Sequence, residues 1–356
     1  MSNCSILVLN LNGLADTIEC LDSVLASDAA GAEILVLDNG SANDEAAALR
    51  ERYGDAIRVL RSEVNTGFPG GNNLLARETT REFILLLNND TAVPAVWLTP
   101  LIAHLEANPD CAAAQPTLLS YADPSRFDMA GAAGGYIDAL GYPYTRGRVF
   151  THPELEAGLF TEPALIDWAC GACALFRRET YLEHGGLDAR FFSYMEEIDL
   201  CWRLKTAGHA IAHVPAARIR HKGGRTWKKM PFRRNYLVRR NSYYLLAANA
   251  PYGELLWKLP LRYAFEAASA LHFCLQREWH TAAATAAAGF VSLFTLGPWL
   301  ARSDRSSLGA GFVTVEFFLL GRKRFGDLSP ATRRASSALG MTDEAGVLVG
   351  APEARV

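Results

Sequence analysis

The sequence EILVLDNGS occupies residues 33–41 and joins an apolar run of strand length to a polar turn. Similar apolar runs lie on either side of it, at Ser5–Asn10, Ile57–Leu60 and Phe83–Leu87. The segments between them show the spacing of amphipathic helices. Strands that alternate with helices in this way predict a parallel sheet covered by helices on both faces. We therefore expect a Rossmann-like α/β unit whose ligands collect at the carboxyl ends of the strands.

The pattern changes in the second half of the chain. Residues 120–165 are rich in Gly, Pro and Tyr, which predicts irregular loops and a short hairpin reaching over the site. Regular patterning returns at Asp167–Phe176, and Ile198–Ala207 has helical spacing. From Pro231 onward the chain is expected to be helical.

The composition limits the function classes. The 356 residues are half apolar and 21% charged, which is typical of globular proteins with room for two domains. A net charge of −3 argues against nucleic acid as a partner, although Arg218–Arg240 contains ten Lys or Arg and no Asp or Glu. Seven irregularly spaced cysteines favour a reducing compartment, and the pair Cys170 and Cys173 suits a packed strand. The N-terminus lacks the pattern of a signal peptide, so we expect a cytoplasmic protein.

One long stretch raises the question of membrane contact. Trp279–Ala301 contains no Asp, Glu, Lys or Arg and is long enough to cross a bilayer. It is rich in alanine and interrupted by Gly297 and Pro298, so three alternatives stay open: a span, an interfacial helix and a buried helix. Together with the basic segment Arg218–Arg240, it favours peripheral attachment to an anionic membrane surface.

Polar residues follow several of the predicted strands. Asp38 ends one strand, where a carboxylate can accept hydrogen bonds from a nucleobase or a ribose. The segment NTGFPGGNN (65–73) opens a helix, and its glycines let backbone amides approach a phosphate. Asp90 follows the strand FILLL, and a single carboxylate there suffices for Mg²⁺ bound to a diphosphate. The candidate ligands of a nucleotide are Asn10, Asn12, Asp38, Asn65, Gly67, Gly70, Gly71, Asn72, Asn88 and Asn89.

Three acids, Glu196, Glu197 and Asp199, lead into a predicted helix. Acids are favoured at a helix N-terminus, but this crowding exceeds what capping requires. Like charges raise one another's pKa, which can produce a base that works near neutral pH. Asp199 is placed to pair with Arg203 four residues on, so Glu197 and Glu196 are the competing candidates for the base.

In their order, these motifs resemble those of family 2 glycosyltransferases, which are inverting GT-A fold enzymes that use nucleotide diphosphate sugars. The matching segments are VLDNGS (36–41), NTGFPGGNN (65–73), LLLNNDT (85–91), CGACALFRRE (170–179), GGLDARFFSYMEEIDLCWRLKTAGH (185–209) and HKGG (221–224). The resemblance implies a GT-A domain over residues 1–230. Within it, residues 1–115 would bind the nucleotide sugar and residues 116–230 would form the acceptor and catalytic half. Residues 231–356 would be a helical, membrane-associating extension.

The resemblance also implies roles for single residues. Asp38 would contact the nucleobase, and Asp90 and His221 would hold Mg²⁺ or Mn²⁺. Asn88 stands where the family has the first aspartate of its Asp-X-Asp motif, so the metal site has one negative charge fewer. Glu197 stands where the family has its catalytic base, which is usually an aspartate.

Two segments, NTGFPGGNN and GGLDARFFSYMEEIDL, look most like bacterial rhamnosyltransferases of cell-surface polysaccharide assembly. This implies dTDP-L-rhamnose as the donor, with UDP-linked and GDP-linked sugars left open. The acceptor would be a saccharide or a polyprenyl-diphosphate-linked saccharide at the cytoplasmic face of the membrane. A homodimer is also left open.

Three rival functions can be weighed against the sequence. A sugar nucleotidyltransferase needs a Gly-rich first loop with Arg or Lys, and an NAD dehydrogenase needs a dinucleotide fingerprint. Residues Asn10–Asp16 contain neither. The third rival is an inert homologue that acts as a membrane-bound binding subunit. The missing first aspartate favours it, whereas the joint presence of Asp90, Glu197 and His221 argues against it.

Overall fold

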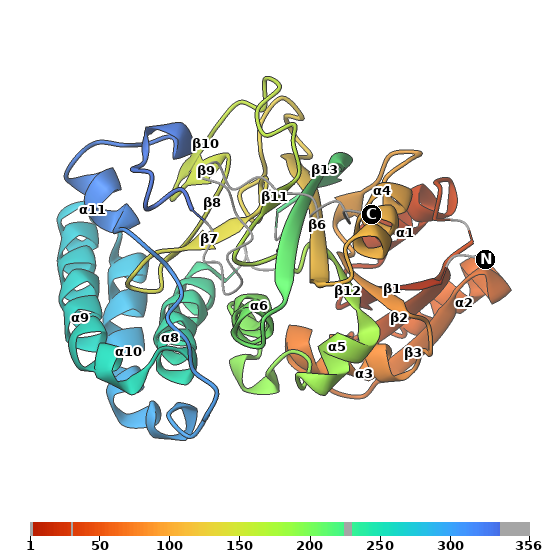
Figure 1. Ribbon diagram of the computed structural model, residues 1–356. Coiled ribbons are helices and arrows are strands. Elements are labelled where there is room, and N and C mark those ends of the chain that lie inside the picture. Colours follow the sequence, from red (N-terminus) through yellow and green to blue (C-terminus); the bar gives the residue numbers. More distant parts are fainter. Residues whose placement is uncertain (1–2, 30, 224–229, 335–356) are drawn as a thin grey trace, which may run out of the picture.

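The computed structural model describes residues 3–29, 31–223 and 230–334, and a nine-stranded sheet lies at its centre (Figure 1). The strands are β1 Cys4–Asn10, β2 Glu33–Asn39, β3 Arg58–Ser62, β4 Phe83–Asn88, β5 Thr91–Ala92, β6 Cys111–Ser120, β11 Ala164–Leu165, β12 Cys173–Arg177 and β13 Ala210–His221. They lie in the order β11-β13-β6-β12-β4-β1-β2-β3, and β5 pairs with β13. Strands β1 to β4 are parallel, as the alternation predicts, whereas β12 runs antiparallel to both β4 and β6.

Helices connect and cover these strands. They are α1 Leu14–Leu25, α2 Glu45–Tyr53, α3 Gly67–Arg77, α4 Leu98–Ala107, α5 Arg178–Glu183 and α6 Glu196–Thr206, with short 3-10 turns at Gly54–Ala56 and Ala189–Phe191. The strands β1 and β4 are buried along almost their whole length, which explains their nearly continuous apolar sequences. Helix α3 begins at Gly67, within the segment 65–73 that was expected to open a helix.

A second sheet was not predicted. Its strands are β7 Gly135–Ile137, β8 Pro143–Thr145, β9 Arg148–Val149 and β10 His152–Pro153, and they form an antiparallel sheet in the order β10-β9-β8-β7. The expectation of loops with one short hairpin was therefore incomplete. Strands of two or three residues are too short to show the alternation by which a strand is recognised in sequence.

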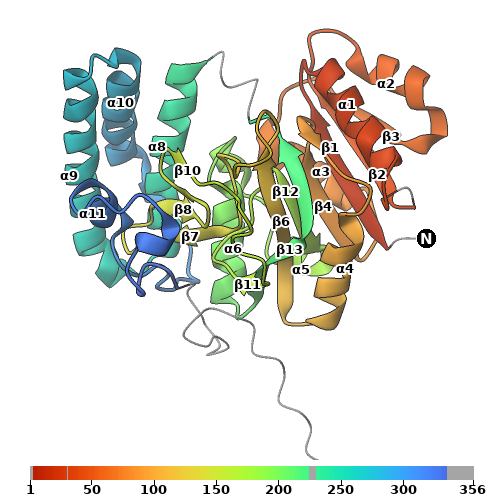
Figure 2. The same ribbon diagram turned by 90° about the horizontal axis from the view of Figure 1, so that it is seen from above.

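The C-terminal region is helical, as expected. It contains α8 Pro231–Asn249, α9 Tyr252–Leu275, α10 Trp279–Thr295 and α11 Val313–Phe318, with 3-10 turns at Gly297–Trp299 and Phe325–Asp327. Figure 2 shows α8, α9 and α10 side by side on one flank of the molecule, opposite β3 and α2. Helix α8 packs against both α10 and α6. Three of the cations of the basic segment, Arg225, Lys228 and Lys229, lie outside the described residues.

Helix α10 covers most of the uncharged stretch Trp279–Ala301. None of the helices in the described part of the chain combines the length and the hydropathy needed to cross a bilayer.

Candidate active site

Three predicted site residues end neighbouring strands at one edge of the sheet. Asn10 of β1 is in register with Asp38 of β2, and Leu9 is in register with Asn88 of β4. Because parallel strands present their carboxyl ends at the same edge, the structure brings these three residues to that edge. The register places the side chains of Asn10 and Asp38 on one face of the sheet and that of Asn88 on the other.

Asp38 is fully buried at this edge. Its Oδ1 accepts a hydrogen bond from the backbone amide of Ser41 at 3.1 Å. Its Oδ2 is buried and has no hydrogen-bond partner among the described residues. Burial of an unsatisfied carboxylate oxygen is unfavourable, so this atom is suited to accept a hydrogen bond from a ligand.

Asn10 and Asn12 are occupied by protein contacts. Asn10 accepts a hydrogen bond from Thr17 at 2.8 Å and donates to Oε2 of Glu45 at 2.7 Å. The side-chain oxygen of Asn12 accepts from the backbone amide of Ala42 at 2.9 Å. Both side chains connect the turn after β1 with the residues that follow β2, so their role is to support the site.

The glycines of residues 65–73 allow close packing. Gly67 has a φ of +74°, and a Cβ at this position would lie 2.4 Å from the carbonyl oxygen of Phe192. A Cβ on Gly70 would lie 2.9 Å from the side chain of Thr66, and one on Gly71 would lie 2.8 Å from Leu9. These glycines therefore let α3 approach both the sheet and the loop around residue 192.

The polar groups at the start of α3 are largely paired within the protein. The amide of Gly67 donates to Oδ1 of Asn65 at 2.9 Å, and the amide of Phe68 donates to the carbonyl oxygen of Phe192 at 2.9 Å. Asn72 donates to the carbonyl oxygen of Phe68 at 3.0 Å. Binding of a phosphate by these residues stays a prediction.

A chain of buried polar residues links Asp90 to His221. Oδ1 of Asp90 lies 3.1 Å from Nε2 of His221, and Nδ1 of His221 lies 3.1 Å from Oδ2 of Asp128. Asn88 approaches the same Nε2 at 3.4 Å, whereas Asn89 turns away and donates to Thr17 at 2.8 Å. The pairing of His221 with Thr91 across β13 and β5 brings the histidine beside Asp90.

The contacts between Asp90, His221 and Asp128 favour the protonated, charged form of His221. Burial by itself lowers the pKa of His221, but hydrogen bonds and the negative charges of Asp128 and Asp90 outweigh burial and raise the pKa to about 10. Two buried carboxylates are thereby neutralised in part by one imidazolium.

The same residues suit a divalent cation. A carboxylate oxygen and an imidazole nitrogen that face each other are donors for Mn²⁺ and, with more oxygen ligands, for Mg²⁺. Asp128 on the other ring nitrogen is the outer partner that metal-bound histidines commonly have. The described residues contain no group of three or more His, Cys, Asp or Glu arranged to hold a metal, so a cation here also needs substrate or water oxygens.

Glu196 and Glu197 stand at the start of α6 in a different environment. Both have an Oε2 that is buried and lacks a hydrogen-bond partner in the described structure. Burial, and then the charges of Glu197 and Asp199, raise the pKa of Glu196 well above its ordinary value. Burial also raises the pKa of Glu197, although backbone amides, including that of Gly171, oppose the shift. Glu196 is buried, whereas Glu197 keeps part of its surface exposed.

Residues 170–172 connect the glutamates with the sheet edge. The carbonyl oxygen of Ala172 accepts a hydrogen bond from the amide of Asn88 at 3.0 Å. A Cβ on Gly171 would lie 2.9 Å from the ring of Phe68 and 3.9 Å from Oε1 of Glu197. Glu197, the glycine segment and the end of β4 therefore surround this short segment.

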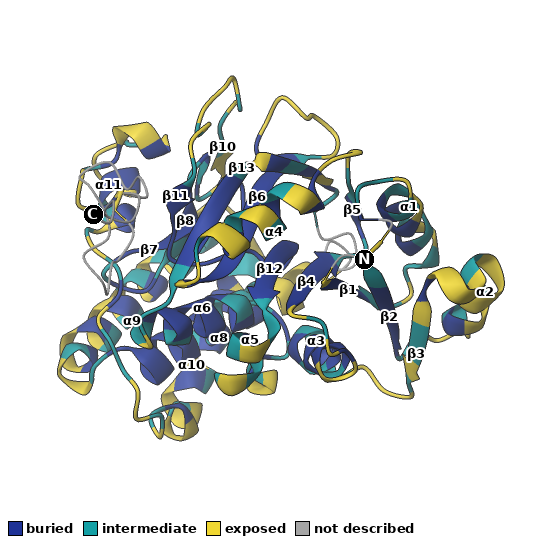
Figure 3. Ribbon diagram, turned by 45° about the vertical axis from the view of Figure 1, so that its right-hand side comes forward, coloured by how far each residue is buried: buried dark blue, intermediate teal, exposed yellow. Residues whose placement is uncertain are grey.

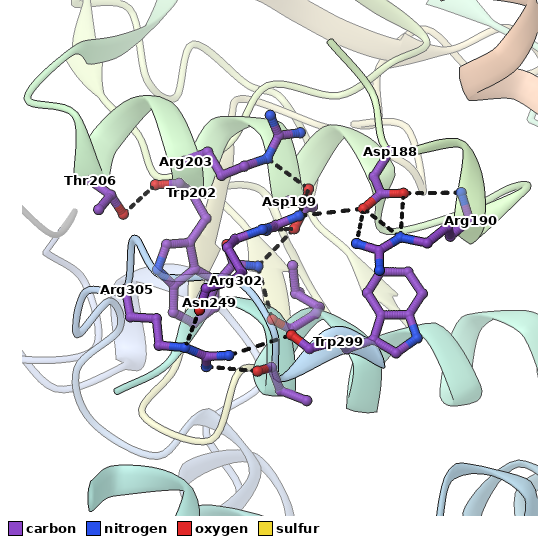
Figure 4. Close-up of polar contacts among 12 residues, drawn as sticks. Asp188, Arg190, Asp199, Trp202, Arg203, Thr206, Asn249, Trp299, Arg302 and Arg305 are labelled. Carbon is purple, nitrogen blue, oxygen red and sulfur yellow. Dashed lines mark hydrogen bonds and ion pairs between the residues drawn. The ribbon is translucent and has the colours of Figure 1, made fainter. Parts of the chain in front are cut away.

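Asp199 has a structural environment (Figure 4). Its carboxylate accepts hydrogen bonds from Arg203 at 2.9 Å, Arg302 at 2.6 Å and Asn249 at 2.8 Å. Although burial raises its pKa, the two arginines outweigh burial and lower the pKa below the ordinary value. The predicted pair with Arg203 is confirmed. Asp199 therefore joins α6 to α8 and to the segment after α10.

Sequence reasoning missed two residues of the site. Asp128 lies in a segment without periodicity, 93 residues before His221, and Asn241 lies in α8, 47 residues after the loop that it contacts. Neither belongs to a recognisable motif, so only their spatial neighbours identify them.

Comparison with known proteins identifies the family. The model of the family "Glycosyl transferase family 2" matches residues 5–185, which is just over half of the chain. The chain belongs to this family. It is therefore a glycosyltransferase. The resemblance to family 2 glycosyltransferases found in the sequence is confirmed.

The similar proteins include rhamnosyltransferases. An N-acetylglucosaminyl-diphospho-decaprenol L-rhamnosyltransferase of Mycobacterium tuberculosis is 27% identical over 261 residues, which are 67% of this chain and 81% of the relative. Rhamnosyltransferase WbbL of Escherichia coli is 39% identical over 57 residues, which are 16% of this chain and 22% of the relative.

Solved structures with the same architecture are glycosyltransferases as well. GalNAc-T7 with UDP, GalNAc and Mn²⁺ matches with a TM-score of 0.54 and 16% identity, covering 70% of this chain and 48% of its own. The mannosyltransferase PcManGT of Pyrobaculum calidifontis, in complex with GDP-Man and Mn²⁺, matches with a TM-score of 0.51 and 15% identity, covering 82% and 87%. The expected GT-A fold with added C-terminal helices is thereby confirmed.

Proposed function

We propose that this glycosyltransferase moves a sugar, with inversion, from a nucleoside diphosphate sugar to a saccharide or a polyprenyl-diphosphate-linked saccharide in cell-surface polysaccharide synthesis. The proposed donor is dTDP-L-rhamnose, because the Mycobacterium tuberculosis relative is an L-rhamnosyltransferase that aligns over 81% of its length. The observation that carries the reaction is the partly exposed Glu197 beside Gly171, in the short segment whose Ala172 is hydrogen-bonded to Asn88 at the end of β4.

Donor binding would use the sheet edge. Oδ2 of Asp38 would accept a hydrogen bond from the nucleobase, since no described residue occupies it. Asp90 and His221 would hold Mg²⁺ or Mn²⁺, which when bound offsets the negative charge of the diphosphate. Asn88 is close enough to His221 to contribute a neutral ligand or a ribose contact.

Glu197 would act as the general base. It would take the proton from the acceptor hydroxyl while the hydroxyl oxygen attacks the anomeric carbon from the face opposite the diphosphate. The new C–O bond forms as the bond to the diphosphate breaks, so the configuration inverts. A raised pKa makes a carboxylate a better proton acceptor near neutral pH. Glu196 is buried and would support the loop instead.

The proposed division of labour follows the sequence. Residues 1–115 would bind the donor, residues 116–230 would supply the acceptor side and the base, and residues 231–356 would form the membrane-associating extension. In this scheme the enzyme would work in the cytoplasm, at the inner face of the membrane.

The surface of α9 and α10 supports membrane attachment better than the basic segment does. Arg218 pairs with Glu156, Lys222 with Asp16, and Arg239 with Glu266, so several of those cations already have partners. The large apolar and aromatic residues exposed on the two helices are Tyr252, Leu256, Trp257, Leu261, Leu271, Leu275, Trp279, Phe290, Leu293 and Phe294.

Helix α9 buries charged side chains and exposes apolar ones, the reverse of an ordinary surface helix. The charged side chains of Lys258, Arg262 and Glu266 are buried, and no exposed residue of this helix is Asp, Glu, Lys or Arg. Figure 3 shows exposed residues on the group of C-terminal helices to which α9 belongs. An exposed apolar face of this size is typical of an interaction surface. The exposed cations Arg277, Lys323 and Arg324 in the same region would complement anionic lipids.

Flotation with vesicles of phosphatidylglycerol and phosphatidylcholine tests this attachment. The double variant Phe290→Ser and Phe294→Ser should lose vesicle binding, whereas Val64→Ser and Val96→Ser, which are similarly exposed elsewhere, should keep it. Light scattering tests the rival explanation, a homodimer through the same face. Wild-type protein that is dimeric and does not float, with a monomeric Phe290/Phe294 variant, would contradict membrane docking.

A panel of nucleotide sugars tests the function itself. The cognate donor should raise the melting temperature of the protein in the presence of Mn²⁺, because ligands stabilise the state to which they bind. Transfer should then be detected with a polyprenyl-diphosphate-linked acceptor. Asp90→Asn should weaken donor binding and turnover while the fold persists, and full activity of this variant in EDTA would refute the metal assignment. Donor binding without transfer to any acceptor would favour the inert homologue.

A further inference from the structure

The loop that precedes the two glutamates has an unusual backbone. Phe192, Tyr194 and Met195 have φ values of +66°, +72° and +77°, and none of them is glycine. Side chains disfavour this left-handed region, and such residues persist only where the surrounding structure holds them. Glu196 and Glu197 follow directly, so the conformation of the loop determines where their side chains point.

Helix α8 holds the backbone of this loop through the side chain of Asn241, and its Arg233 also lies over the ring of Phe192. Nδ2 of Asn241 lies 2.9 Å from the carbonyl oxygen of Phe191, 2.8 Å from that of Ser193 and 2.9 Å from that of Tyr194. Asn241 is completely buried. An amide nitrogen has two hydrogens, which the three carbonyl oxygens share.

The orientation of this amide is determined by its other end. Arg240 donates to Oδ1 of Asn241 through Nε at 3.0 Å and Nη2 at 2.8 Å. A guanidinium has only donors, so it requires the oxygen on its side and directs the NH₂ group towards the loop. On the opposite side of the loop, the carbonyl oxygen of Phe192 accepts from the amide of Phe68.

Asn241 is not needed merely to attach α8 to the rest of the protein. Asn249, the last residue of the helix, donates to Asp199 at 2.8 Å, and Arg302 joins the same network. Tyr244 stacks on Trp299 with ring centroids 4.7 Å apart. The contacts of Asn241 are therefore specific to the backbone in front of the glutamates.

We infer that Asn241 is a positioning residue, whose amide holds the backbone of residues 191–195 so that Glu197 faces the acceptor hydroxyl. Helix α8 of the C-terminal extension thereby belongs to the catalytic unit. The inference rests on the proposed role of Glu197, but it concerns a residue that would touch neither donor nor acceptor.

Kinetics of Asn241→Ala and Asn241→Gln test the inference, with Ser242→Ala as the matched control. Ser242 is the next residue of the same helix, is buried, and exchanges hydrogen bonds with Arg239 and Arg262 instead of the loop. Asn241→Ala should reduce kcat by about 10–100-fold, because misplacing a reacting group by about 1 Å has an effect of this size. The KM for the donor should stay within about twofold of wild type, because uniform binding is unaffected. Asn241→Gln keeps the NH₂ donor on a longer side chain and should recover part of kcat.

The control separates positioning from stability. Ser242→Ala should lower the melting temperature but leave kcat near that of wild type. Equal kcat values for Asn241→Ala and Ser242→Ala, or a rise in KM without a fall in kcat, would overturn the inference. If Asn241→Ala does not fold, Asn241→Gln is compared with Ser242→Ala by the same criteria. Wild-type protein without transfer activity would instead refute the proposed function.

Discussion

The two carboxylate clusters of the site differ in how their charge is compensated. Asp90 and Asp128 share His221, which lies 3.1 Å from each of them, and the pKa of the histidine is raised to about 10. Glu196 and Glu197 are adjacent to each other, and each has a buried oxygen without a hydrogen-bond partner in the described structure. The first cluster is compensated within the protein, and the second is not.

This difference separates binding from chemistry. In the first cluster, a metal ion can take the place of the positive charge on His221. The carboxylates then still have a positive partner. An uncompensated carboxylate holds its proton more tightly and is suited to accept one from a substrate. Asp199 is the internal control, because it stands in the same helical turn as the glutamates and yet two arginines lower its pKa.

The largest effect is expected at Glu197. Glu197→Gln removes the proposed base without changing the size of the side chain, so turnover should fall by about 10²–10⁴-fold. Donor binding, measured by calorimetry, should persist. Glu196→Gln serves as the control and should lose less activity. Normal turnover of Glu197→Gln together with an inactive Glu196→Gln would move the base to Glu196.

A large loss of stability is expected at Asp199. Asp199→Asn leaves Arg203 without its buried counter-charge and leaves Arg302 with only its longer pair to Asp188 at 3.4 Å, which should lower the free energy of unfolding by about 3 kcal/mol. Urea denaturation measures this loss. Asp22→Asn is the control, because the ion pair of Asp22 with Arg52 is about half exposed and should contribute little. A change at Asp199 as small as that of the control would contradict its structural role.

A smaller effect is expected at Asp128. Asp128→Asn keeps a side chain of the same size but removes the charge that orients His221, so the affinity for Mn²⁺ should fall by about 10–100-fold. Titration of the protein with Mn²⁺ in the presence of a nucleoside diphosphate measures this affinity. Asp123→Asn, an exposed site in the same segment, should bind the ion as wild type does. Unchanged affinity in Asp128→Asn would separate Asp128 from the metal site.

The smallest effect is a pH dependence at Glu196. The folded protein raises the pKa of Glu196 above 4.5, so it binds this proton more tightly than the unfolded chain does. The stabilisation is present at low pH and is lost as the pH rises through the raised pKa. Gln has no such proton, so the stability of Glu196→Gln relative to wild type should increase with pH. Denaturation at a series of pH values measures the difference, and a constant difference would mean that Glu196 ionises normally.

Most of the fold could be predicted from local pattern. The runs EILVLD and FILLL are apolar because their strands are buried on both faces, and this pattern is visible without any contact map. The motif order also identified the family, and the pair of Asp199 with Arg203 followed from helical spacing. The apolar runs, the individual motifs and the spacing of the Asp199–Arg203 pair are each short local signals in the sequence.

Other features depended on contacts between distant residues. The second sheet has strands too short to be recognised, and Asp128 reaches His221 across 93 residues. The same holds for Asn241, which contacts a loop 47 to 50 residues earlier in the chain. Buried charges on α9 were hidden as well, because helical spacing does not reveal which face is covered.

The sequence by itself therefore determined the α/β alternation, the positions of the motifs at strand ends and the family. The tertiary structure decided which acids are compensated and which are not. The physical reason is that apolar periodicity is a local property of the chain, whereas the pKa of a buried carboxylate depends on the charges and donors that folding brings to within a few ångströms.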